Sequence, residues 1–148
     1  MKKYKIIRNR EGKKSVVLGD NQTEKLNGSE TNNNFLLIEQ DDEPGVEIPL
    51  HIHKNEDELF RVIEGEMEIR IDKNTYVLKK GDTAFCPRGI PHSWKAIGNK
   101  RLKTILFITP SGLEPMFSEL SQLKDFPPNF QKVARIAKKY DIDFLNPS

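Results

Sequence analysis

The chain has 148 residues, of which 36% are hydrophobic, and its 24 basic and 22 acidic residues leave a formal net charge of +2. This length allows one domain with one hydrophobic core, and the balanced composition excludes global disorder. The basic residues form no dense patch interleaved with aromatic side chains, so we expect no nucleic-acid partner. No apolar run is long enough to span a membrane or to form the core of a signal peptide, so we expect a cytoplasmic protein with no membrane partner.

Two regions of β-type sequence are predicted before residue 110. Residues 1–34 contain short apolar pairs between polar stretches and end in an Asn-rich turn, which predicts two or three short strands. Residues 35–109 alternate short β-rich runs with Gly, Pro, Asn and Asp, a pattern typical of an antiparallel sandwich or barrel. The strands predicted in this second region are 35–40, 47–53, 58–64, 66–72, 75–79, 83–86, 92–97 and 101–109.

The pattern changes to a helical period in residues 110–148. The segment 111–114 has the Ser-x-x-Glu form of a capping box and predicts a helix start, with Phe117, Leu120 and Leu123 on its apolar face. A second helix is predicted to begin at Pro128. We therefore expect a single all-β domain with two C-terminal helices covering it.

The three histidines are placed where they could share a metal ion. His51 and His53 lie two residues apart in a predicted strand, so both imidazoles project from one face. Glu58 opens the next strand, and an antiparallel return would bring it beside His53; Glu56 and Asp57 are alternative carboxylates at this point. His92 opens another strand. Three imidazoles and a carboxylate suit one divalent transition metal ion, namely Fe, Mn, Ni, Co, Cu or Zn.

The spacing of these residues resembles the two sequence motifs of the cupin superfamily. The first motif is matched with intervals of five, one, four and six residues by Gly45, His51, His53, Glu58 and Gly65. The second is matched with intervals of five, one and two residues by Gly81, Pro87, Gly89 and His92. Fifteen residues, 66–80, separate the motifs, as in compact single-domain bacterial cupins. Ala96 stands where the second motif usually has Asn, which is not a ligand in that family.

The resemblance covers about residues 35–109 and implies a double-stranded β-helix (jelly-roll) barrel with a metal ion at its mouth. By this resemblance the metal ligands would be His51, His53, Glu58 and His92. The segments 17–20, 109–114 and 137–145 also resemble a subgroup described as quercetin dioxygenase-like.

The resemblance implies a metal-dependent enzyme, and most concretely a dioxygenase acting on a small organic substrate. Glu58 would then be a catalytic residue as well as a ligand, because a carboxylate beside the ion can accept a substrate proton. Two alternatives stay open. One is a non-oxidative enzyme such as an isomerase, epimerase, lyase or decarboxylase, and the other is a binding module without turnover.

Strand parity predicts the residues around the ion. Phe60 and Val62 share a face with Glu58, and Trp94 and Ala96 share one with His92, so these four would line an apolar substrate pocket or form barrel core. Apolar residues on the opposite faces of these strands, which point away from the histidines, must also be shielded from solvent. We expect a homodimer to supply part of this shielding, as in other small cupins.

Overall fold

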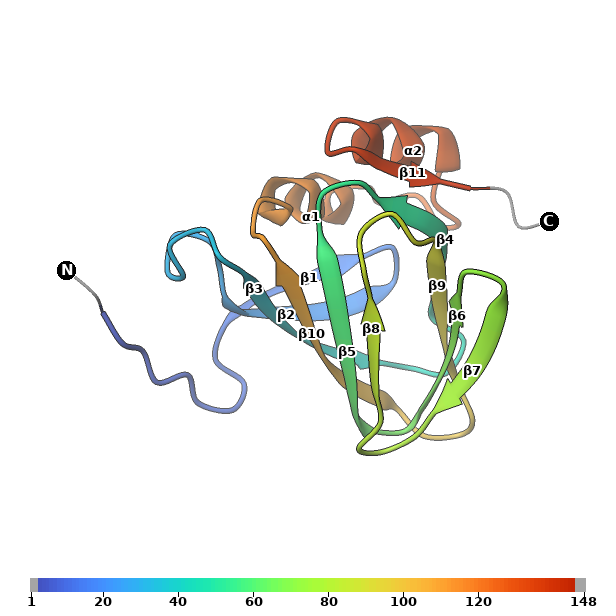
Figure 1. Cartoon of the computed structure of the whole chain (residues 1–148), viewed down its shortest axis with the longest axis horizontal. Helices are drawn as coiled ribbons and strands as arrows, with labels where there is room; N and C mark the ends of the chain where they lie inside the picture. The colour runs from blue at the N-terminus through green and yellow to red at the C-terminus, as the bar shows by residue number, and fades with distance from the viewer. Residues whose placement is uncertain (1–2, 146–148) are drawn as a thin grey trace.

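Two antiparallel β-sheets face each other and enclose the core, with two helices at one end (Figure 1). The computed structural model describes residues 3–145. The strands are β1 (Lys13–Val17), β2 (Asp20–Leu26), β3 (Leu36–Asp42), β4 (Glu47–His53), β5 (Asp57–Glu64), β6 (Glu66–Ile71), β7 (Asn74–Leu78), β8 (Thr83–Cys86), β9 (His92–Ile97), β10 (Leu102–Thr109) and β11 (Ile142–Phe144). The helices are α1 (Glu114–Ser121) and α2 (Phe130–Lys138).

The first sheet has the strand order β1-β2-β3-β10-β5-β8, and the second has the order β11-β4-β9-β6-β7. Successive strands of the chain alternate between the sheets in β3, β4, β5 and β6, which gives the closed two-layered form of a jelly roll. The all-β prediction with two C-terminal helices is confirmed. The strands predicted between residues 35 and 109 agree with the observed ones to within a few residues at each end.

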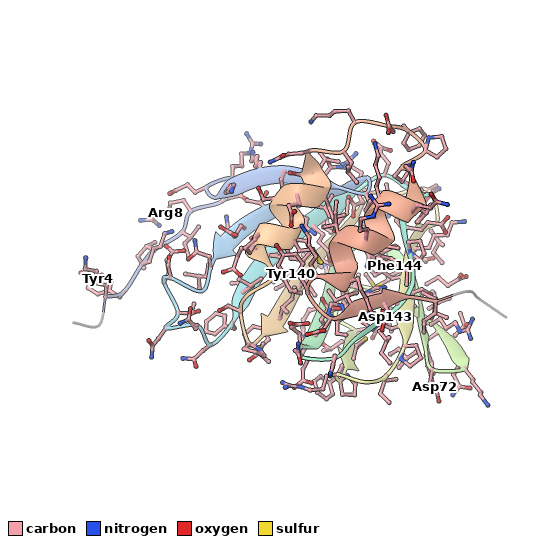
Figure 2. The ribbon with its side chains drawn as sticks, turned by 90° about the horizontal axis from the view of Figure 1, so that it is seen from above. Tyr4, Arg8, Asp72, Tyr140, Asp143 and Phe144 are labelled. Carbon is pink, nitrogen blue, oxygen red and sulfur yellow. The ribbon has the colours of Figure 1, made fainter. Side chains whose placement is uncertain are left out.

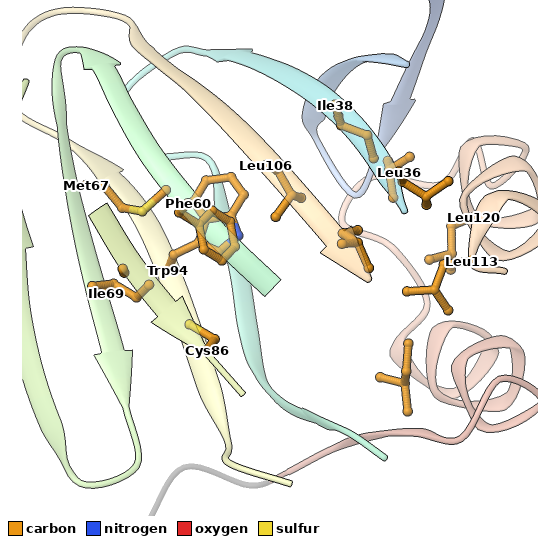
Figure 3. Close-up of a cluster of buried hydrophobic side chains, with 14 of the residues drawn as sticks. Leu36, Ile38, Phe60, Met67, Ile69, Cys86, Trp94, Leu106, Leu113 and Leu120 are labelled. Carbon is orange, nitrogen blue, oxygen red and sulfur yellow. The ribbon is translucent and has the colours of Figure 1, made fainter. Parts of the chain in front are cut away.

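Alternating side chains fill the space between the sheets. In β10, every second residue is buried, namely Leu102, Thr104, Leu106 and Ile108, while the residues between them face outward or are partly covered. Figure 3 shows Phe60 and Trp94 together between the sheets, with Leu36 and Leu113 nearer the helices. This apolar core fixes the strands that carry the histidines.

The capping-box prediction for the first helix is wrong. The N-cap of α1 is Leu113, and no side chain caps this end. The Glu114 carboxylate instead accepts hydrogen bonds from the backbone N–H groups of Gly28 (2.8 Å) and Gly112 (2.7 Å), so it ties the turn after β2 to the helix. Leu123 lies beyond the end of the helix.

The C-terminal segment covers one end of the barrel, which Figure 2 shows from above. Helix α2 begins at Phe130, two residues after Pro128, with Asn129 accepting hydrogen bonds at its N-terminus. Strand β11, which the sequence did not predict, then pairs with β4 and places Ile142 opposite His53 and Phe144 opposite His51. The hydroxyl of Tyr140, which lies two residues after the end of α2, donates to Glu119 of α1 at 2.8 Å and so joins the segment after α2 to α1. Within residues 3–145, neither helix has the length and apolar character needed to cross a membrane.

Candidate metal centre

Four side chains from three strands converge at the covered end of the barrel. His51 and His53 come from β4, Glu58 from β5 and His92 from β9. One donor atom from each lies within 4.8 Å of the others, and all four side chains are buried. The β4–β9 pairing sets His51 opposite His92, so residues that are 41 positions apart in sequence (92 − 51) meet across two adjacent strands.

The loop 87–91 delivers His92 to this cluster. Its Gly89 has a φ of +81°, a conformation that a side chain would disfavour, and its backbone N–H donates to the His53 carbonyl at 2.8 Å. The loop is therefore fastened to the strand that carries the other two histidines. The positive φ explains why a glycine serves at this position of the second motif.

Each histidine of β4 is oriented by a hydrogen bond on the ring nitrogen away from the cluster. His51 Nδ1 donates to the Pro49 carbonyl at 2.7 Å, and His53 Nδ1 lies 3.0 Å from Glu56 Oε1. In both rings Nε2 is left for the cluster. Glu58 Oε1 lies 3.3 Å from His53 Nε2 and 2.8 Å from His92 Nε2.

These distances fit a single divalent ion. Two ligands at about 2.1 Å from one ion and at a right angle are about 3.0 Å apart, between the two distances from Glu58 Oε1. Imidazole nitrogen and carboxylate oxygen are also the donor types that Fe, Mn, Ni, Co, Cu and Zn accept. The coarse prediction of a buried three-His, one-Glu cluster is thus confirmed, whereas the identity of the ion stays a prediction.

The electrostatics of the cluster also favour a cation. Burial, together with the charges of His92 and His53, lowers the pKa of His51 to about 3, so its ring is neutral. Burial alone would lower the pKa of His53 too, but the charge of Glu58 and the hydrogen bonds to Glu56 and Glu58 raise it to about 10. Burial opposes ionisation of Glu58, yet His53 and His92 hold the pKa of its carboxyl well below its usual value. A positive charge, from a proton or an ion, is therefore stabilised at this point.

An apolar cavity of about 60 Å³ adjoins the cluster, with His51, His53 and Glu58 on its wall. Phe60 and Trp94, two of the predicted pocket residues, line it. Val62 and Ala96 are fully buried two positions farther along their strands and are not on the cavity wall. The cover is supplied by α1 and β11 through Met116, Phe117, Leu120, Ile142 and Phe144.

A buried polar network forms part of the cavity wall. Asp20 and Gln22 from β2 and Gln40 from β3 line the cavity, and both Gln side chains donate to Asp20 Oδ2, at 2.9 and 2.8 Å. Thr104 of β10 donates to Gln40 at 2.6 Å. Behind them, Asp42 is also buried, and burial raises the pKa of both Asp20 and Asp42. Asp42 raises the pKa of Asp20 further, through a hydrogen bond and through charge repulsion.

Sequence reasoning missed this network and the contact between Glu56 and His53. The one available signal for the network was the run of polar residues at alternate positions of two strands, Asp20 and Gln22, then Gln40 and Asp42. Of the three carboxylates considered, only Glu58 joins the cluster. Asp57 instead binds the exposed Arg88 side chain, at 3.1 and 3.2 Å.

Cys86 lies across from Glu58 in the β5–β8 pairing and is buried. Burial, with a smaller contribution from the charge of Glu58, raises the pKa of its thiol to about 12. The thiol is therefore protonated and unreactive near neutral pH, consistent with a core residue.

Residues 38–109 match the family model described as the cupin domain. This chain contains a cupin domain. It is 27% identical over 150 residues to quercetin 2,3-dioxygenase of Bacillus subtilis, covering 95% of this chain and 44% of that protein. It is 32% identical over 65 residues to a 5-nitrosalicylic acid 1,2-dioxygenase of a Bradyrhizobium species, covering 44% of this chain and 30% of that one. The chain thus spans less than half the length of these curated relatives.

Solved structures show the same fold. A predicted oxalate decarboxylase from Thermotoga maritima superposes with a TM-score of 0.66 at 24% identity, covering 72% of this cupin and 99% of that chain. KdgF from a Halomonas species superposes with a TM-score of 0.65 at 19% identity, covering 77% of this chain and 99% of that one. At these identities the likeness concerns the fold alone.

Proposed function

We propose that this cupin is a metal-dependent dioxygenase acting on a small organic substrate. The observation that carries the proposal is the buried cluster of His51, His53, Glu58 and His92, the first three of which lie on the wall of an apolar cavity. Two relatives bear the names of dioxygenases, which supports oxidative chemistry over other reactions of the fold. A bound divalent ion would supply a Lewis acid and, for redox-active metals, a centre for electron transfer.

The residues of the chain have distinct tasks in this proposal. His51, His53 and His92 would hold the ion, while Glu58 would be a ligand whose carboxylate can also accept a substrate proton. Phe60 and Trp94 present apolar surfaces that orient the substrate body and exclude water. The Gln22 and Gln40 side chains give the cavity a polar wall.

The cavity size favours a small substrate. Its volume of about 60 Å³ is well below the roughly 300–1,000 Å³ typical of sites for drug-sized ligands. A large substrate would enter only if α1 or β11 moved, because both contribute to the cover.

Oxygen consumption tests the proposal. The protein would be loaded with Fe²⁺ or Mn²⁺ and mixed in turn with catechol, 5-nitrosalicylic acid and quercetin. We expect oxygen uptake with at least one of the two single-ring compounds, and a decrease of about 100-fold or more in Glu58→Gln. Turnover without oxygen would favour a non-oxidative enzyme, and saturable binding without any product would favour a binding module; either result would contradict the proposal.

A further inference from the structure

We propose that Glu56 is a positioning residue for the metal centre, whose carboxylate holds the Nδ1–H of His53 and thereby directs the Nε2 lone pair of His53 toward the ion. This inference rests on the metal-binding part of the proposed function. It concerns a residue outside the four-ligand cluster, at a position that neither sequence motif specifies.

The placement of Glu56 is unusual for a turn carboxylate. The residue lies in the connection between β4 and β5, yet its exposed fraction is 6%, similar to the 4% of His53 and the 5% of Glu58. Among residues 3–145, His53 Nδ1 is its only hydrogen-bond or ion-pair partner, at 3.0 Å. A carboxylate that is buried without a Lys or Arg partner costs stability, so its position indicates a role in the function of His53.

The other two imidazoles are held differently, which makes the contact with Glu56 distinctive. His51 Nδ1 donates to an uncharged carbonyl, that of Pro49, at 2.7 Å. His92 Nδ1 is buried and has no hydrogen-bond partner within the described part of the chain. Of the three Nδ1 atoms, only that of His53 donates to a carboxylate, which fixes the tautomer of His53 and makes its Nε2 a stronger donor to a metal. His53 should therefore contribute more to the affinity for the metal ion than a histidine without such a hydrogen bond would.

Metal affinity tests the inference without any assay of turnover. The parent, Glu56→Gln, Glu56→Ala and the control Glu47→Gln would be freed of metal with a chelator. Each would then be titrated with Co²⁺ against a chromophoric chelator, with the visible spectrum of bound Co²⁺ and the melting temperature of the ion-free protein also recorded. Glu47 is an exposed carboxylate at the start of β4, so its replacement removes one charge far from the ring nitrogens.

We expect Glu56→Ala to weaken Co²⁺ binding by about 10- to 100-fold and to change the spectrum. Glu56→Gln should lie between Glu56→Ala and the parent, because a carboxamide oxygen still accepts the Nδ1–H bond, and Glu47→Gln should match the parent. Unchanged affinity and spectrum in both Glu56 variants, with or without a lower melting temperature, would overturn the inference and leave Glu56 with a structural role. Failure of the parent itself to bind Co²⁺ would overturn the proposed function together with the inference.

Discussion

Replacing Asp20 with asparagine should raise the stability of the protein at neutral pH and remove part of its pH dependence. Asp20 Oδ1 and Asp42 Oδ2 are buried, and neither oxygen accepts a hydrogen bond from an N–H or hydroxyl group of residues 3–145. Burial, the hydrogen bond to Asp42 and its charge raise the pKa of Asp20 well above the usual 3.8, so we infer that the two carboxyls share a proton in the folded protein. The unfolded chain releases this proton above about pH 4.

The sign of the effect follows from this difference. Above pH 4 and below the raised pKa of Asp20, the folded state binds one more proton than the unfolded state. Stability is therefore full below the unfolded pKa and is lost as the pH rises, by up to about 1.4 kcal/mol per pH unit for one proton. The loss ends where the pH passes the raised pKa of Asp20, so between pH 5 and pH 7 it is at most about 2.7 kcal/mol.

Asparagine reproduces the protonated state of Asp20 without a proton. Its amide N–H can donate to Asp42, and its carbonyl can accept from Gln22 and Gln40 as Asp20 Oδ2 does. The difference in free energy of unfolding between variant and parent, measured by urea denaturation from pH 5 to pH 7, should grow with pH. Asp41→Asn is the matched control. Asp41 directly precedes Asp42 in β3, but its side chain is exposed and binds Arg101. Parallel stability curves for the parent and Asp20→Asn, or a variant less stable than the parent at pH 7, would refute the reasoning.

Three further outcomes test the fold and its assembly. Phe60→Ala should lower the free energy of unfolding by about 3–5 kcal/mol in urea, because the ring is 1% exposed; a loss below about 1 kcal/mol would contradict its place in the core. Gly65→Ala should lower the stability more than Gly81→Ala. Both glycines have a positive φ, but only at Gly65 would an added Cβ approach a carbonyl oxygen, that of Arg101 at 2.4 Å. Equal melting temperatures of the two variants would contradict this prediction. We expect a homodimer that forms through the sheet edges, because Val77 and Phe85 of the edge strands β7 and β8 are about half exposed. Light scattering should give twice the 17.1 kDa of one chain, and a mass of 17.1 kDa would contradict the prediction.

The sequence predicted the strands well where Gly, Pro, Asn or Asp marks their ends and inward positions are apolar. The strand 47–53 is found at those bounds because apolar Ile48, Leu50 and Ile52 stand at alternate positions of its sequence and turns flank it. Strand β11 was missed because a three-residue strand has too few positions for a period and depends on β4 for pairing. The cap of α1 was mispredicted because Glu114 binds Gly28, a contact 86 residues distant in sequence.

The cluster itself could be predicted because its residues occupy two recognisable motifs with fixed spacing. Its surroundings could not, since they depend on tertiary geometry. The role of Glu56 depends on how the turn after β4 folds back onto His53. The polar network depends on the register that sets Gln40 between Gln22 and Thr104 across three strands.

Elemental analysis of the protein, purified without chelators or a metal-affinity tag and compared with His51→Ala, tests the metal centre most directly. His51 is 6% exposed, and its ring is held by the Pro49 carbonyl, so the variant removes one donor from the cluster. We expect about one transition metal ion per chain in the parent and a large loss in the variant. The absence of bound metal from both proteins, even after reconstitution with Fe²⁺, Mn²⁺, Co²⁺, Ni²⁺, Cu²⁺ and Zn²⁺, would contradict the account.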